Sequence, residues 1–139
     1  MREIIFRGKR TDNGEWVEGY LTRRPSAIQY ETHYSPWYID KPPRDPDDNG
    51  DFYNVDPETI GQFTGLIDAD GKRVFEGDIL KNKEGFVYFG KHIAEVVFDE
   101  GRFCGLGDYP FEPSDFHRCE IIGNIHDNPE LLNEREDTK

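Results

Sequence analysis

The sequence predicts a small, mainly β protein. Short segments rich in β-branched and aromatic residues follow one another at nearly regular spacing, and no window of twelve residues keeps a 3.6-residue apolar period. Glycine (14) and proline (9) together make up 23 of the 139 residues, which favours many turns. This pattern is typical of a small β-barrel or a β-sandwich. We expect one β-rich domain over residues 1–132 and a polar tail at 133–139.

The first predicted element is a β-hairpin over residues 3–21. Polar and apolar residues roughly alternate at the start of the chain, and Asn13-Gly14 supplies the positive φ angles of a tight turn. On the returning strand, Trp16 and Tyr20 share one face. We expect that face to be buried, because one apolar face of a strand must be covered.

Residues 22–54 form a less regular excursion. Short strands are indicated by its aromatic residues, namely Tyr30, Tyr34, Trp37 and Tyr38. The acidic, proline-rich segment 41–51 cannot form a strand ladder, because its three prolines lack an N–H donor and its carboxylates repel one another. We expect it to be an exposed, mobile loop.

The second half of the chain predicts short strands separated by turns. Asp56 can cap a helical turn that begins at Pro57, and Asn128 can cap a last turn that begins at Pro129. Strands are predicted at residues 74–80, 85–89, 93–98, 102–106 and 118–125, with a hairpin turn at 99–101. The predicted core residues are Trp16, Val17, Phe75, Ile79, Leu80, Val96, Phe98, Ile121 and Ile125.

Charge and composition exclude several kinds of partner. The formal net charge is −12; residues 1–24 carry six basic and four acidic groups, a net of +2, so the remainder carries −14. This balance makes duplex DNA an unfavourable ligand and disfavours anionic membrane surfaces. No run approaches the roughly 18 apolar residues of a membrane span. The start lacks the apolar segment of a secretory signal, so we expect a cytoplasmic protein in which Cys104 and Cys119 are reduced.

One acidic segment has the spacing of a calcium loop. Its oxygen ligands would come from Asp45, Asp47, Asn49, Asp51 and Asp56. The last of these is shorter than the usual glutamate, and the prolines leave no helix entering the loop. The prediction therefore assigns no metal, and calcium is a minor alternative.

Two further groupings carry possible chemistry. His117 and Cys119 would share one face of a strand, where they could ligate a metal or act as base and nucleophile. No orienting acid stands at a recognisable spacing, so a half-buried cysteine beside an ordinary histidine is favoured. In the first hairpin, Arg7, Lys9 and Arg10 alternate with aromatic residues, as in single-stranded nucleic-acid binders. No catalytic residue and no cofactor is predicted.

Three stretches carry a resemblance to a known family. They are REIIFRGKRTDNGEWVEGYL at 2–21, YNVDPETIGQFTGLIDADGKRVFEGDIL at 53–80 and EIIGNIHDNPELL at 120–132. In order and spacing they resemble the YopX family of bacteriophage and prophage proteins. The resemblance implies a small β-rich fold with an SH3-like barrel, encoded by a phage or prophage and acting in the cytoplasm of a Gram-positive host. It implies no catalytic residue.

These observations lead to one expected function and two alternatives. We expect a non-enzymatic protein–protein interaction module that binds a host or phage protein or forms a homo-oligomer. The first alternative is an acidic mimic of DNA that inhibits a host nucleic-acid-binding protein. The second is a single-stranded nucleic-acid binder that uses Arg7, Lys9 and Arg10 of the first hairpin.

Overall fold

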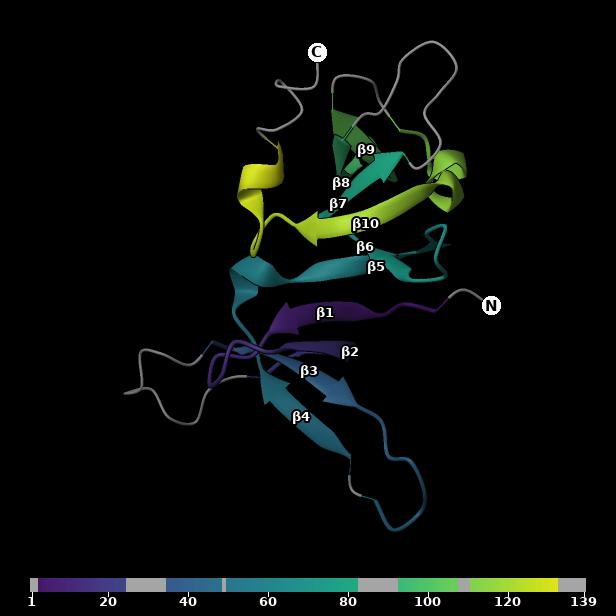
Figure 1. Ribbon diagram of the computed structural model, residues 1–139. Helices are drawn as coiled ribbons and strands as arrows, with labels where there is room; N and C mark the ends of the chain where they lie inside the picture. Colours follow the sequence, from purple (N-terminus) through teal and green to yellow (C-terminus); the bar gives the residue numbers. More distant parts are fainter. Residues whose placement is uncertain (1–2, 25–34, 49, 83–92, 108–110, 133–139) are drawn as a thin grey trace. The chain divides into compact units, whose positions relative to one another are not determined.

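The computed structural model describes residues 3–24, 35–48, 50–82, 93–107 and 111–132 (Figure 1). The chain is mainly β, as predicted, and divides into two compact units, Met1–Gln62 and Phe63–Lys139. Tyr30, Tyr34, the predicted strand at 85–89 and the tail at 133–139 lie outside the described residues. Within the described residues the helices are three short 3-10 turns, and none is long and apolar enough to cross a membrane.

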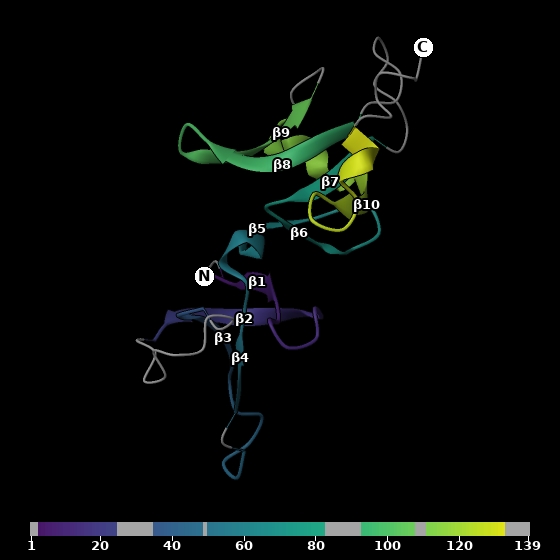
Figure 2. The ribbon, with the colours of Figure 1, turned by 90° about the vertical axis from the view of Figure 1, so that its left-hand side faces the viewer.

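The first unit is an antiparallel arrangement in which each strand pairs with the next. It contains β1 (Phe6–Lys9), β2 (Trp16–Arg23), β3 (Trp37–Lys41) and β4 (Asp51–Asn54) (Figures 1 and 2). The predicted first hairpin is confirmed. Its connection, residues 10–15, is longer than the predicted tight turn, and it is closed by a hydrogen bond from Arg10 N to Glu15 O at 2.9 Å.

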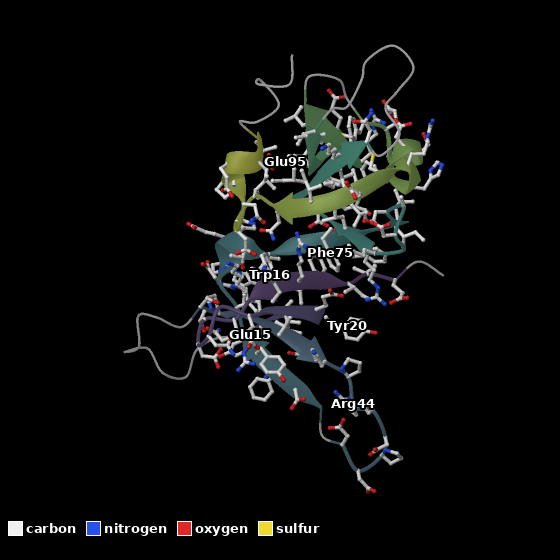
Figure 3. The ribbon with its side chains drawn as sticks, viewed as in Figure 1. Glu15, Trp16, Tyr20, Arg44, Phe75 and Glu95 are labelled. Atoms are coloured by element: carbon white, nitrogen blue, oxygen red, sulfur yellow. The ribbon has the colours of Figure 1, made fainter. Side chains whose placement is uncertain are left out.

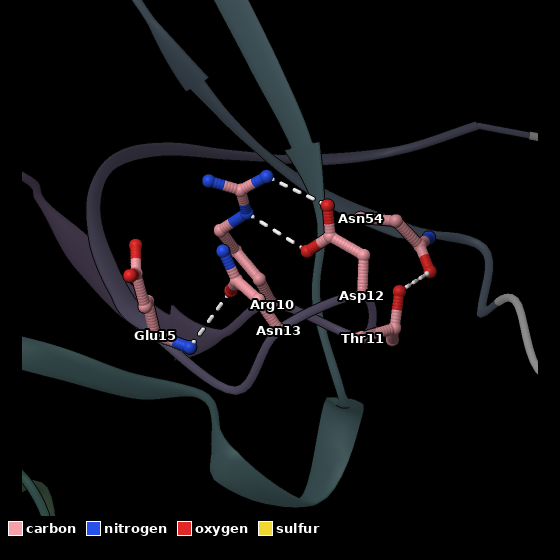
Figure 4. Close-up of polar contacts among 6 residues, drawn as sticks. All are labelled: Arg10, Thr11, Asp12, Asn13, Glu15 and Asn54. Atoms are coloured by element: carbon pink, nitrogen blue, oxygen red, sulfur yellow. Dashed lines mark hydrogen bonds and ion pairs between the residues drawn. The ribbon is translucent and has the colours of Figure 1, made fainter.

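The end of β4 returns to the first hairpin. Arg10 and Val55 form an antiparallel bridge, and Thr11 N donates to Asn54 O at 3.0 Å. Figure 4 shows the side chains that reinforce this contact, among them Thr11 Oγ1, which donates to Asn54 Oδ1 at 2.8 Å. The predicted turn at Pro57 is the 3-10 helix η1 (Pro57–Thr59), and Asp56 caps it by accepting from Glu58 N at 3.0 Å.

The core of this unit corrects the predicted burial of the first hairpin. Val17, Ile39 and Val55 are buried, with Leu21 packed against them. Since side chains alternate across a strand, Trp16 and Tyr20 point to the opposite face. Trp16 is half-buried and Tyr20 is 53% exposed, so the prediction that their face is buried was wrong (Figure 3).

The acidic segment connects β3 to β4. Its first and last residues, Lys41 and Asp51, pair in the ladder, so the connection is shorter than predicted. Residues 42–47 are exposed, as predicted, whereas their mobility stays a prediction. The connection is shaped by its own carboxylates, since Asp48 accepts from Arg44 N at 2.9 Å and from Gly50 N at 2.8 Å.

In the second unit, strands pair in two groups. β5 (Gly61–Ile67) begins with the last two residues of the first unit, which pair with β1, and its later part pairs with β6 (Arg73–Phe75). The other group has the order β10-β7-β8-β9, made of β7 (Asp78–Asn82), β8 (Ile93–Asp99), β9 (Arg102–Gly107) and β10 (Cys119–Asn124). Two 3-10 helices complete it, η2 (Pro113–Arg118) and η3 (Pro129–Leu132). The described strands form open antiparallel sheets and no closed barrel, which corrects the barrel implied by the family resemblance.

The single strand predicted over residues 74–80 is in fact two strands. Gly77 has a φ of 94°, and the chain turns at this point so that β6 and β7 pair with different partners. The buried carboxylate of Asp78 stabilises the turn by accepting from Phe75 N at 2.7 Å.

The core of the second unit confirms four predicted residues, Phe75, Ile79, Leu80 and Val96. Ile121 and Ile125 are only half-buried. Phe98 is 54% exposed and packs against Phe103, with ring centroids 5.0 Å apart. The prediction that Phe98 is buried was wrong because it lies next to the β8–β9 turn, past the packed part of the sheet. That turn is tight, as predicted, with φ angles of 52° at Glu100 and 81° at Gly101.

Candidate interaction surface

The first unit carries exposed aromatic residues on the face of β2, β3 and β4 that is opposite its core. The register places Tyr20 opposite Asp40 and Asp40 opposite Phe52, so the three form one row across three strands. Directly opposed side chains on one face have Cβ atoms about 4.5–5.5 Å apart. Asp40 therefore lies between two aromatic residues, Tyr20 at 53% exposure and Phe52 at 59%.

An arginine occupies part of this row. Arg24 Nη2 lies 2.8 Å from Asp40 Oδ2, and the guanidinium carbon is 4.5 Å from the Phe52 ring centroid. The same guanidinium lies 5.2 Å from the ring of Tyr38, which contacts Phe52 edge-on at 5.9 Å. We call this set, Tyr20, Arg24, Tyr38, Asp40 and Phe52, the aromatic groove.

The groove opens onto a hollow of about 230 Å³. Besides groove residues, the hollow is lined by residues at the two ends of the β3–β4 connection, namely Lys41, Pro42, Pro43, Gly50 and Asp51. Gly50 is needed there: its φ is 76°, and a Cβ would lie 2.8 Å from Lys41 O. The hollow thus joins aromatic and proline surfaces with two acidic and two basic residues, a chemistry suited to binding a peptide.

The sequence did not reveal this groove. Tyr20 was predicted to be buried, and Phe52 and Asp40 were not singled out. A signal was present in β2, where Val17 and Leu21 share one face and leave Tyr20 on the other. The sequence does not show that Asp40 and Phe52 join Tyr20, because that depends on the register of three strands.

The three basic residues of the first hairpin do not all meet at one ring. Arg7 and Lys9 lie over the Trp16 ring, at 4.8 and 5.5 Å from its centroid, whereas Arg10 lies 4.5 Å from the ring of Tyr53. Arg10 also pairs with Asp12, Nη2 to Oδ2 at 2.6 Å (Figure 4), and this hydrogen bond lowers the pKa of the Asp12 carboxyl. The Trp16 ring therefore already has cationic groups of its own chain beside it.

The residues of the possible calcium loop are spread along the hairpin. Asp45 and Asp47 lie in the β3–β4 connection, Asp51 begins β4, and Asp56 caps η1 beyond the other end of β4. Asn49 lies outside the described residues. In the described part of the chain, no three His, Cys, Asp or Glu side chains gather as metal ligands.

His117 and Cys119 do not share a strand face, which corrects the sequence-based expectation. His117 is exposed in η2, and Cys119 is the first residue of β10 and fully buried. Burial raises the pKa of the Cys119 thiol to about 12, so the thiol is protonated at neutral pH and a poor nucleophile. Cys104 and Cys119 are both free, as predicted.

Comparison with known proteins identifies the family. The YopX protein family matches residues 5–133. The crystal structure of protein EF1440 from Enterococcus faecalis is similar, with 27% sequence identity and a TM-score of 0.54, over 95% of this chain and 99% of that chain. A comparison with curated proteins found no match. The resemblance seen in the sequence is confirmed, and the chain belongs to the YopX family.

Proposed function

We propose that this chain is a non-enzymatic interaction module that binds another protein, either a host or phage protein or a second copy of itself, through the aromatic groove. We also propose, from the family resemblance, that it is encoded by a phage or prophage and acts in the host cytoplasm. The observation that supports the module most directly is the row of Tyr20, Asp40 and Phe52, which leaves two large rings exposed on a paired sheet.

The physical argument concerns what the exposed rings gain on association. Apolar surface transferred from water contributes roughly 25 cal/mol per Å², so covering two aromatic rings supplies a few kcal/mol. Tyr20 is held on β2 and Phe52 on β4, and both strands are paired with β3, which lies between them. Little side-chain entropy is then lost on binding, and for this reason aromatic and arginine residues are enriched where interfaces bind most strongly.

The test compares the wild-type protein with the double variant Tyr20→Ser/Phe52→Ser. Self-association is measured by sedimentation velocity over a range of concentrations, and capture of host or phage proteins is measured with the immobilised chain. The control is Ile67→Ser, because Ile67 is similarly exposed (52%) but lies in the second unit.

We expect the double variant to lose the association that the wild type and the control retain. The proposal is wrong if the wild type stays monomeric and captures nothing. It is equally wrong if every association survives in the double variant while its circular dichroism matches that of the wild type.

The two alternatives have weaker support. For single-stranded nucleic acid, a base would have to displace Arg7 and Lys9 from the Trp16 ring. For mimicry of DNA, carboxylates would have to present themselves as a phosphate-like stripe, yet Asp48 is engaged by the backbone of its own loop. Both alternatives remain predictions that a gel-shift assay and a nuclease-inhibition assay would test.

A further inference from the structure

We infer that the aromatic groove recognises an arginine side chain in an extended segment of the partner, and that Arg24 occupies this site until the partner's arginine displaces it. This inference rests on the proposed function and specifies its ligand. The four observations that carry it are the contacts of Arg24, the exposure of its ion pair, the charge around the groove and the shape of the hollow.

Arg24 shows the chemistry that the groove accepts. Its guanidinium is paired with a carboxylate at 2.8 Å and lies within 5.2 Å of two ring centroids, those of Phe52 and Tyr38. A planar guanidinium can stack on a ring while it donates to a carboxylate in its own plane, which the compact ammonium group of lysine does less well. A second hydrogen bond holds the Asp40 carboxylate in place: Thr22 Oγ1 donates to Asp40 Oδ1 at 3.2 Å, and Arg24 pairs with the other oxygen, Oδ2.

The contact is strong enough to order Arg24 and weak enough to be exchanged. The side chains of Arg24 and Asp40 are 42% and 29% exposed. An ion pair with this much exposure to water changes an equilibrium constant by less than about tenfold. An arginine presented by a partner gains the same pairing together with the contacts of its own chain, so it can replace Arg24.

The surroundings of the groove favour a cationic ligand. Residues 1–62 carry twelve acidic and eight basic groups, a net of −4, and the adjoining connection contains Asp45, Asp47 and Asp48 against one basic residue, Arg44. A field of this sign attracts a basic segment and raises its rate of association. Among the described residues no cation lies over the Tyr20 ring, so that ring can contact the incoming segment.

The shape of the site indicates an extended segment. The hollow of about 230 Å³ has room for one long side chain, and it is bordered by Pro42 and Pro43. A peptide with proline or alanine beside its arginine would lay small apolar groups on this border while the guanidinium reaches Asp40. Recognition of extended, proline-containing segments by aromatic surfaces is a general mode of peptide binding.

The experiment is a calorimetric titration of the full chain with three peptides. The first is acetyl-Ala-Pro-Pro-Ala-Arg-Ala-Pro-Pro-Ala-amide. The second carries citrulline in place of the arginine, which keeps the shape and removes the charge, and the third carries lysine. Each is titrated into the wild type, Asp40→Asn, Arg24→Gln and the control Arg118→Gln. Arg118 is a matched choice, because it is 50% exposed and pairs with Asp115 at 2.9 Å in the second unit.

We expect the arginine peptide to bind the wild type and the Arg118→Gln variant equally, and to bind Asp40→Asn several-fold more weakly, since an ion pair that is partly exposed to water is lost. Arg24→Gln should bind several-fold more tightly than the wild type, because no internal arginine competes. A merely structural role for Arg24 would not increase the affinity. The citrulline peptide should bind several-fold more weakly than the arginine peptide, because it cannot form the ion pair with Asp40, and the lysine peptide should lie between them.

The inference is overturned if the arginine peptide binds neither the wild type nor Arg24→Gln, if Arg24→Gln weakens binding, or if citrulline binds as well as arginine. If Asp40→Asn lowers the stability of the protein, the titration of Arg24→Gln still tests whether Arg24 competes with the arginine of the peptide. If the peptides fail but Tyr20→Ser/Phe52→Ser still abolishes association, only the ligand class is wrong and the interaction module stands. If that double variant also has no effect, the proposed function itself fails.

Discussion

Replacing Asp68 tests most sharply how buried polar groups stabilise the second unit. Its carboxylate is 3% exposed and accepts three backbone hydrogen bonds. Oδ1 accepts from Asp70 N at 2.9 Å and Lys72 N at 2.8 Å, and Oδ2 accepts from Ile121 N at 3.1 Å. One side chain thus joins the turn after β5 to the strand β10, 53 residues away.

The magnitude follows from what each N–H loses in Asp68→Ala. A hydrogen bond to a charged group contributes about 1.5–3 kcal/mol, and a buried donor left without an acceptor costs about 1–3 kcal/mol. Asp70 and Lys72 are exposed, so water can solvate their N–H groups and recover most of the loss, whereas Ile121 is half-buried. We expect a loss of about 3 kcal/mol for Asp68→Ala and about half of that for Asp68→Asn, which keeps one acceptor oxygen.

The assay is urea unfolding followed by far-ultraviolet circular dichroism, with amide hydrogen exchange of Ile121 as the local measure. With a urea dependence of about 1–3 kcal/mol per M, a loss of 3 kcal/mol lowers the midpoint by about 1–3 M. The control is Asp99→Ala, since Asp99 is an exposed aspartate at the end of β8 and its loss should change stability by less than about 0.5 kcal/mol. If Asp68→Ala behaves like the control and exchange at Ile121 is unchanged, the reasoning is refuted.

Three further outcomes follow from the same structure. Because burial raises the pKa of Cys119 from 9.0 to about 12, the native thiol keeps its proton where the unfolded thiol loses it, so the free energy of unfolding should fall as pH rises from about 9 to 12. A thiol reagent at pH 8 should modify Cys104 well before Cys119, and equal rates of modification would contradict the burial of Cys119. Gly19→Ala should lower the free energy of unfolding, measured by thermal unfolding, by about 2–3 kcal/mol, because its Cβ would lie 2.4 Å from Asp40 O on the neighbouring strand. An unchanged stability would mean that β2 and β3 can move apart without loss of free energy. Asn54→Ala should lower the free energy of unfolding by about 2–3 kcal/mol, because its side-chain amide donates to Ser35 O at 2.6 Å and to Trp37 O at 3.1 Å. An unchanged melting temperature would show that water fully replaces these two hydrogen bonds.

Local signals in the sequence were sufficient for hairpins and caps. The turn containing Gly14, the turn at Glu100-Gly101 and the cap at Asp56 all depend on the conformation of a few adjacent residues. Such features are determined by adjacent residues, so a single sequence is sufficient to predict them.

Burial and strand continuity were harder to predict, because both depend on distant partners. Trp16 and Val17 are adjacent and cannot face the same side of a strand, and only the packing of Ile39 and Val55 selects Val17 for the core. In the same way, Gly77 could be a bend within one strand or a turn between two. The choice depends on the pairing of β6 with β5 and of β7 with β8 and β10.

Most of the candidate site could not be predicted from local patterns. Tyr20, Asp40 and Phe52 lie far apart in the chain and meet only because two strand pairings have the observed register. A shift of either pairing by one residue would move one of the three to the opposite face. The residues that attracted attention in the sequence, His117 with Cys119 and the acidic loop, stood out because they were close in sequence.

The most direct test of the central claim is photo-crosslinking inside the bacterial host. A photoreactive benzoylphenylalanine is placed at Phe52 of the aromatic groove, and in a separate protein at Ile67, which is similarly exposed. The account predicts that light joins a second polypeptide chain at position 52 and not at position 67. Crosslinks of equal yield at both positions, or at position 67 alone, would contradict it.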